Sequence, residues 1–357
     1  MATQEIDSGR AEAFAGRLLG IINDGMLSLM VSVGHRAGLF EAMAGLGWAD
    51  SASIAAAAGL QERYVREWLG AMTTGRIVEY DGKARAYRLP PEHAASMTRA
   101  AGPGNVAAFS QFVPLLGKVE EGILASFREG GGVPYEQFPE FQRLMAENSA
   151  LVFDSALLDV VVPLVPGLPA RLEEGIDVAD VGCGSGHAIN LMAEAYPNSR
   201  FVGFDFSAEG VAVGAAEAAA KGLHNARFEN RDVATLRGPA AYDLVTTFDS
   251  VHDQARPAEV LRGIFEMLRP RGTYLCVDVQ ASSDLAGNVD HPLGPFLYTV
   301  SCMHCMTVSL AQGGAGLGAV WGEQKARQML AEAGFIDVRV ETVPRDILNN
   351  YYVATRL

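Results

Sequence analysis

The residues that decide the fold are Val178-Ala-Asp180-Val-Gly182-Cys-Gly184-Ser-Gly186-His187, a glycine-rich loop between an apolar run and a helical pattern that begins near Ala188. Glycine allows a tight turn and a close approach of the backbone to a ligand, and the first turn of the following helix offers N–H groups that lack a partner within the helix. A dinucleotide-binding loop has its glycines at G-x-G-x-x-G, whereas His187 occupies the third of these places here. The spacing of Gly182, Gly184 and Gly186 therefore disfavours a nicotinamide dinucleotide.

From Ile176 onward, apolar runs alternate with helical patterns, which is typical of βαβ units built around a parallel sheet. We expect strands at residues 177–182, 200–204, 226–229, 244–247, 273–279, 337–341 and 351–355. A helix is expected at 323–333, after an irregular insertion at 281–317. The prediction is a seven-stranded, Rossmann-like α/β domain that follows an all-α/winged-helix domain.

Two acidic residues follow the second and third of these strands, at the strand ends where open α/β sheets bind their ligands. Asp205 has the spacing of an acid that accepts hydrogen bonds from both hydroxyls of a ribose. Asp232 could accept from an adenine amino group while Val233 donates its backbone N–H. Together with the glycine loop they fit an adenosine-shaped ligand, although Asp205 alone could equally cap a helix. We add further strand-end residues to this site, namely Phe206, Phe248 and Asp249.

These features resemble the class I S-adenosylmethionine-dependent methyltransferases, and the resemblance covers the chain from Ile176 to its end. It implies that the protein is an enzyme and that S-adenosylmethionine is its cofactor. It also implies a role for Asp180, two residues before the first glycine, in organising the methionine end of the cofactor.

A histidine follows the fourth expected strand, where it is predicted to lie near the cofactor. His252-Asp253 resembles the His-Asp-Trp segment of small-molecule O-methyltransferases from natural-product pathways, in which the histidine is the general base. Gln254 stands in place of the tryptophan, so the aromatic ring that would stack on adenine is missing. We expect His252 and Asp253 to be catalytic; a structural or substrate-binding histidine is the alternative.

Cys302-Met303-His304-Cys305 could supply three metal ligands, but a tetrahedral zinc site needs a fourth, and neither a second cysteine pair nor a His-x-x-x-His follows. We therefore expect no metal here and assign the segment to the wall of the acceptor pocket. Core packing explains the aromatic residues equally well. The substrate-binding candidates are Phe138, Phe141, Met145, Phe296, Met303 and His304. They suggest a largely apolar acceptor without selecting one, and leave O-, N- and S-methylation open.

The first 100 residues read as short helices followed by a hairpin signalled by Asp81-Gly82, the order of a winged helix. We expect a winged-helix-like dimerisation domain at 1–100, a helical connector and substrate-pocket wall at 101–165, and the cofactor domain at 166–357. Apolar Leu19, Ile22 and Met26 on one leading helix favour a homodimer. The rival function is a transcription regulator that senses S-adenosylmethionine, yet the recognition helix at 62–74 mixes two acids with two arginines.

The composition limits the choice of partners. Of the 357 residues, 49% are hydrophobic and 20% charged, which suits a folded globular chain. The formal net charge of −14 opposes attraction to nucleic acid and to anionic lipid, so we expect neither as a partner. Charged residues and prolines interrupt the long apolar runs and no signal peptide is visible, so we expect a cytoplasmic protein whose four cysteines are reduced.

Overall fold

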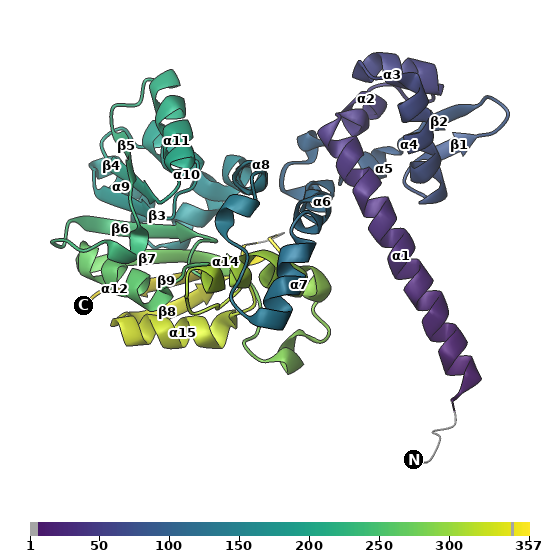
Figure 1. Ribbon diagram of the computed structural model, residues 1–357. Helices are drawn as coiled ribbons and strands as arrows, with labels where there is room; N and C mark the ends of the chain where they lie inside the picture. Colours follow the sequence, from purple (N-terminus) through teal and green to yellow (C-terminus); the bar gives the residue numbers. More distant parts are fainter. Residues whose placement is uncertain (1–5, 344–345) are drawn as a thin grey trace. The chain divides into compact units, whose positions relative to one another are not determined.

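The computed structural model describes residues 6–343 and 346–357, and the chain divides into two compact units, Met1–Pro114 and Leu115–Leu357 (Figure 1). The elements of the first unit are α1 (Ser8–Arg36), α2 (Leu39–Ala44), α3 (Ser51–Ala58), α4 (Glu62–Thr74), β1 (Glu79–Asp81), β2 (Ala86–Arg88), α5 (Pro91–Ala94), η1 (Arg99–Gly104) and η2 (Val106–Gln111). Helix α6 (Phe112–Gly117) crosses the boundary between the units. The boundaries predicted for three domains remain predictions.

The first unit has the helix order and the hairpin that the sequence predicts for a winged helix. Gly59 ends α3 with φ +67°, which makes a left-handed turn between α3 and α4. Strands β1 and β2 pair antiparallel, and Asp81 closes the turn between them by accepting a hydrogen bond from the Lys83 N–H at 2.8 Å. Helix α1 begins at Ser8 because Asp7 caps it, accepting from the Arg10 N–H at 3.1 Å.

Helix α1 is anchored only at its carboxyl end. The Trp68 indole N–H donates to the Met30 carbonyl at 2.8 Å, and Gly34 faces the same ring so closely that a Cβ would lie 2.5 Å from it. Most of the helix projects from the rest of this unit (Figure 1). Its exposed apolar side chains include Phe14, Leu18, Leu19, Ile22 and Met26.

By length and composition, α1 could cross a membrane, and 22% of its most apolar window is buried. Arg17 and Asp24 interrupt the apolar residues of this helix, as expected from the sequence. The bent pair of helical segments at 141–164 and 168–174 meets the same criterion only when it is counted as one span. Length and composition alone are weak evidence, because core helices pass the same test.

The second unit is built on a seven-stranded sheet with the order β5-β4-β3-β6-β7-β9-β8, which confirms the predicted fold class. Its strands are β3 (Asp177–Val181), β4 (Arg200–Asp205), β5 (Ala226–Asn230), β6 (Tyr242–Phe248), β7 (Leu268–Val279), β8 (Ile336–Glu341) and β9 (Asn349–Thr355). Only β9 runs antiparallel to its neighbours β7 and β8. The carboxyl ends of β3, β4, β5, β6 and β7 therefore meet at one edge.

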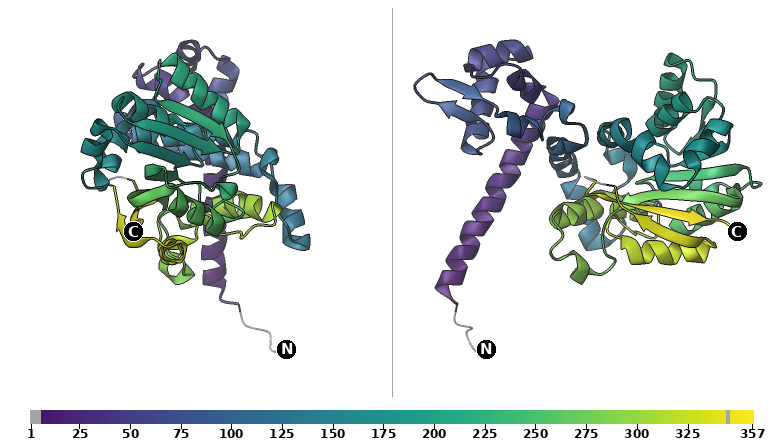
Figure 2. Two further views of the ribbon diagram at one scale, coloured as in Figure 1. Left: turned by 90° about the vertical axis from the view of Figure 1, so that its left-hand side faces the viewer. Right: turned by 180° about the vertical axis from the view of Figure 1, so that it is seen from behind.

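Both faces of this sheet are buried, because successive residues of a strand point to opposite faces. In β3, Val178 belongs to one apolar core and Ala179 to the other. Helices α12 (Pro257–Met267) and α15 (Gly322–Ala333) cover one face, and α9 (Leu168–Glu174) and α10 (His187–Ala195) cover the other (Figure 2). Helix α11 (Ala208–Ala220) packs on β4 and β5.

The remaining helical elements lie before β3 and between β5 and β8. They are α7 (Glu120–Glu129), η3 (Tyr135–Gln137), α8 (Phe141–Ala156), η4 (Leu157–Val161), η5 (Val162–Leu164), η6 (Val233–Thr235), η7 (Leu285–Asn288), α13 (Gly294–Val300), η8 (Ser301–Cys305) and α14 (Met306–Ala311).

The segment expected to be an irregular insertion at 281–317 is instead largely helical. Helix α13, the π-turn η8 and α14 follow one another without a break. The sequence hides this because Thr, Val, Ser and Cys are weak helix formers, and tertiary packing overrides their propensity. Gly132 lies so close to α14 that a Cβ would be 2.7 Å from the Ala311 nitrogen, while the Val133 N–H donates to the Thr307 hydroxyl at 2.7 Å.

Candidate functional site

The glycine loop between β3 and α10 has a backbone that only glycine adopts readily. Gly182, Gly184 and Gly186 have φ values of +77°, +54° and +70°. A Cβ on Gly182 would meet Ser250 at 2.6 Å, whereas one on Gly184 would meet only the Gln142 side chain, at 3.7 Å. The loop is therefore packed against protein at its ends and open at Gly184, as expected of a cradle for a ligand.

Two buried aspartates lie beside this loop. Asp205, at the end of β4, accepts hydrogen bonds from the N–H groups of Gly184 and Ser207, both at 2.8 Å. Burial raises its pKa in spite of these bonds. Asp180, in β3, accepts from the Thr246 hydroxyl at 2.9 Å, and burial raises its pKa to about 7. Asp205 is thus not the cap of α11, since Ser207 holds that position.

The third strand end is less enclosed. Asp232 is 53% exposed at its side chain, accepts from the Ala234 N–H at 2.9 Å and pairs with Arg256 at 2.8 Å. Its carboxylate would have to accept a hydrogen bond from an adenine amino group in addition to the bonds from Ala234 and Arg256. Val233 is buried beside it. Phe206 is exposed, and Phe248 packs edge-on against Phe153 at 4.8 Å.

His252 forms a buried pair with an aspartate that the sequence analysis did not single out. Its Nδ1 lies 2.7 Å from Asp278 Oδ1, which also accepts from the Trp321 indole N–H at 3.0 Å. Because β6 and β7 are parallel neighbours, the turn that follows β6 brings His252 to the carboxyl end of β7. Burial opposes the charged imidazole, but the carboxylate of Asp278 outweighs it and raises the pKa of His252 above its ordinary value.

Further carboxyl groups surround this pair. Asp249, at the end of β6, has φ +51°, and its Oδ1 is buried without a hydrogen-bond partner among the described residues. Burial, then the charge of Asp278, raises the pKa of Asp249 to about 8. Burial also raises the pKa of Asp253 to about 6, against the opposing charge of His252. A site with so many buried carboxyl groups favours a cationic ligand.

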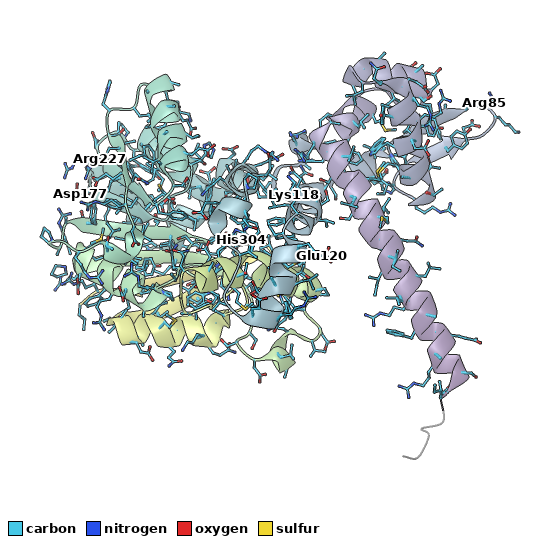
Figure 3. All side chains as sticks on the ribbon, in the orientation of Figure 1. Arg85, Lys118, Glu120, Asp177, Arg227 and His304 are labelled. Atoms are coloured by element: carbon cyan, nitrogen blue, oxygen red, sulfur yellow. The ribbon has the colours of Figure 1, made fainter. Side chains whose placement is uncertain are left out.

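His304, in η8, lies at the centre of an aromatic cluster. It stacks on Phe141 at a centroid distance of 3.5 Å and meets the edges of Phe138 and Tyr135 at 4.7 Å and 5.7 Å. The side chain is fully buried, and neither ring nitrogen has a hydrogen-bond partner in the described part of the chain. Burial, then the charge of His252, lowers its pKa to about 3, so the ring is neutral. In Figure 3, His304 lies well away from Asp177, which begins β3.

The other acceptor candidates are half-buried, namely Met145, Phe296 and Met303. All four cysteines are free, and Cys305 is buried. Within residues 6–343 and 346–357, no three potential ligands gather to hold a metal ion.

Sequence reasoning missed four residues of the site. Asp278 could have been found from the sequence, as an acidic residue in the apolar run of β7, because a buried carboxylate needs a partner. Trp321, which donates to it, lies 43 residues further along the chain. Tyr135 and Gln142, whose side chains share a hydrogen bond of 2.8 Å, gave no local signal.

Comparison with known proteins identifies both domains. A model described as an Rv2258c-like winged HTH domain matches residues 25–99, and a methyltransferase domain model matches residues 172–334. The chain therefore joins a winged helix-turn-helix domain to a methyltransferase domain, as the sequence predicts.

Among curated relatives, trans-aconitate 2-methyltransferase of Deinococcus radiodurans is 33% identical over 111 residues, which cover 31% of this chain and 40% of that protein. The chain spans about half or less of the length of such relatives. Among solved structures, mitomycin 7-O-methyltransferase is similar with a TM-score of 0.70 and 16% identity, over 98% of this chain and 100% of that one. Human N-acetylserotonin methyltransferase, solved with S-adenosylmethionine, has a TM-score of 0.66 and 18% identity, over 100% and 99% of the two chains. These structures share the fold of the whole chain.

Proposed function

We propose that this protein is an S-adenosylmethionine-dependent methyltransferase that acts in the cytoplasm on a small, largely apolar acceptor, with O-methylation favoured over N- or S-methylation. The observation that carries the proposal is that the glycine loop, Asp205 and the buried pair of His252 and Asp278 meet at one edge of one sheet. The methyltransferase domain at 172–334 and the relatives named for methyl transfer support it.

The residues present suit this cofactor. Gly184 leaves the backbone open to a ligand, and Asp205, which accepts from the Gly184 N–H, would also accept from the ribose hydroxyls. The unpartnered oxygen of Asp249 and the half-buried Asp253 would favour the positive charge of a sulfonium. When bound, S-adenosylmethionine supplies an electrophilic methyl group with a neutral thioether as its leaving group.

His252 would act as the general base for a hydroxyl acceptor. Nδ1 faces Asp278, so Nε2 is the nitrogen that takes the acceptor proton. His252 would hold that proton while the acceptor oxygen takes the methyl group. Asp278 then stabilises the imidazolium, as the carboxylate of a catalytic triad does. Only the neutral form of His252 can accept a proton, so kcat should rise with pH through the raised pKa of this group.

The test begins with cofactor binding by calorimetry and a screen of hydroxylated aromatic and lipid-like compounds for release of S-adenosylhomocysteine. His252→Ala should lower kcat by about 10² to 10⁴, the usual contribution of a general base, and leave cofactor affinity nearly unchanged. His224→Ala, at an exposed histidine before β5, is the matched control. Asp278→Asn should lower kcat and move the pH profile to lower pH. A fall of less than threefold for His252→Ala would remove its role as base.

A homodimer through α1 is part of this proposal. Leu19, Ile22 and Met26 recur on one face of α1 and are 61%, 52% and 62% exposed, which leaves an apolar stripe that a second copy of the helix would cover. Light scattering should report a dimer for the wild-type chain and a monomer for Leu19→Glu/Ile22→Glu. Asn23→Glu, which adds charge at an exposed position without removing apolar surface, should stay dimeric. A monomeric wild-type protein would rule this part out.

DNA binding is the second candidate, because the first domain matches a winged helix-turn-helix model. The arginines of the recognition helix α4 are already paired within the helix, Arg66 with Glu62 at 2.8 Å and Arg63 with Glu67. Arginines that are already paired with glutamates neutralise fewer DNA phosphates and so release fewer counterions from the DNA. We therefore expect no specific binding to duplex DNA at physiological salt. A mobility shift with genomic fragments that resists competitor DNA would favour the regulator instead.

A further inference from the structure

Tyr135 joins the two halves of the candidate site. It lies in η3, just before α8, and its ring meets the edges of Phe206 at 5.2 Å and Phe141 at 5.9 Å. The same ring lies 5.7 Å from His304. Phe206 follows the ribose-binding candidate Asp205, whereas Phe141 and His304 belong to the acceptor wall. Rings on several sides thus hold Tyr135 between the candidate cofactor-binding and acceptor-binding residues.

The hydroxyl group of Tyr135 is also held in place. The Gln142 side-chain amide donates to it at 2.8 Å, and the other end of that amide lies 3.7 Å from the point where a Cβ on Gly184 would be. Gln142 therefore connects the tyrosine oxygen to the open part of the glycine loop. Burial, then the charges of Asp253 and Asp205, raises the pKa of Tyr135, so the group stays a neutral phenol with oxygen lone pairs available.

Tyr135 lies beside the groups that would hold the two ends of the reacting centre. With the ribose at Asp205 and the reacting methyl pointing towards His252 and Asp253, the sulfur between them would lie on the side of the site that Tyr135 occupies. A positive charge there would be surrounded by carboxyl groups and by the phenol oxygen in a site with little water. Electrostatic attraction is strong under these conditions.

We propose that the Tyr135 hydroxyl oxygen, positioned by Gln142, faces the sulfonium of the bound cofactor and makes the site select the cationic cofactor over its neutral demethylated product. This inference rests on the proposed function. The sulfur of the demethylated product carries no charge, so the phenol oxygen would no longer attract it. The product would therefore bind more weakly than the cofactor and be exchanged for fresh cofactor.

Calorimetry tests the proposal without knowledge of the acceptor. Three ligands are compared: S-adenosylmethionine, S-adenosylhomocysteine, and sinefungin, which carries an ammonium group near the position of the sulfonium. Tyr135→Phe keeps the ring contacts and removes only the oxygen. It should weaken S-adenosylmethionine and sinefungin by about tenfold, the scale of a hydrogen bond to a charged group, and change S-adenosylhomocysteine by less than about twofold. Gln142→Met should give a smaller change in the same direction.

Tyr274→Phe is the matched control, since it removes a buried hydroxyl that is bonded to Thr247 at 2.7 Å within the sheet. It should leave the ratio of the affinities for S-adenosylmethionine and S-adenosylhomocysteine unchanged. If Tyr135→Phe lowers the affinity for all three ligands equally, the tyrosine serves only packing. If it lowers none of the affinities, the hydroxyl oxygen does not face the sulfonium. Either result overturns the proposal. A wild-type protein that binds none of the three overturns the proposed function itself, and the inference with it.

Discussion

The glycine loop offers a test in which two neighbouring positions separate backbone strain from steric crowding. Gly184 and Gly186 both have left-handed φ values, +54° and +70°. At Gly184 a Cβ would meet only Gln142, at 3.7 Å, which is ordinary contact. At Gly186 a Cβ would lie 2.7 Å from Cζ of Phe228, inside van der Waals distance. The Phe228 ring has little room to move, because Cβ atoms on Gly203 and Gly214 would also lie within 3.0 Å of it.

The expected magnitudes follow from these contacts. An alanine forced into the left-handed region costs about 1 to 2 kcal/mol, and this applies to both positions. Overpacking against the Phe228 ring adds about 1 to 3 kcal/mol at Gly186 alone. Gly184→Ala should therefore lower the melting temperature of the methyltransferase unit by roughly 2 to 8 °C, and Gly186→Ala by roughly 4 to 20 °C, at about 2 to 4 °C per kcal/mol for a domain of this size.

Differential scanning calorimetry of the full chain measures both variants, with the transition of the second unit identified by its shift on cofactor addition. Phe228→Leu supplies the rescue, since a smaller side chain should recover part of the loss in Gly186→Ala and none of it in Gly184→Ala. Equal losses of melting temperature in the two alanine variants would contradict this prediction. So would a Phe228→Leu substitution that recovers no stability in Gly186→Ala.

Further outcomes concern the buried polar groups of the site. His304→Phe keeps the stacking and removes ring nitrogens that lack partners among the described residues, so a thermal shift assay should show a higher melting temperature, while turnover of an acceptor that uses the imidazole falls. The pKa of Asp249 is raised to about 8, so the folded state binds its proton more tightly than the unfolded state and loses stability as pH rises from about 4 to 8. Asp249→Asn should thus raise the melting temperature more at pH 8.5 than at pH 5; an equal gain at both would contradict this. The carboxyl groups of Asp253 and Asp180, with pKa values raised to about 6 and about 7, ionise over the neutral range and then favour a cation. The calorimetric affinity for S-adenosylmethionine relative to S-adenosylhomocysteine should rise from pH 5.5 to 8, and a flat ratio would count against cationic selection.

Local features of the sequence determined much of the fold. The seven strands were predicted from apolar runs. The observed strands overlap the predicted ranges, because each run is a local pattern that ends at polar residues or glycine. The glycine loop was identified for the same reason, since Gly182, Gly184 and Gly186 are the residues that tolerate the backbone found there. The insertion at 281–317 was misjudged because its helices are stabilised by packing rather than by their own propensity.

The pairing of side chains was decided only by the tertiary structure. His252 could be named from its place after a strand, but its partner Asp278 lies in the next strand and Trp321 beyond a further helical segment. Tyr135 likewise meets His304 only because the segment before α8 folds against η8. A sequence pattern specifies which way a residue faces within its own element, whereas the distance between two side chains depends on how the elements pack. The pKa of His252 and the neutral state of His304 follow from that packing, because burial and nearby charge determine both.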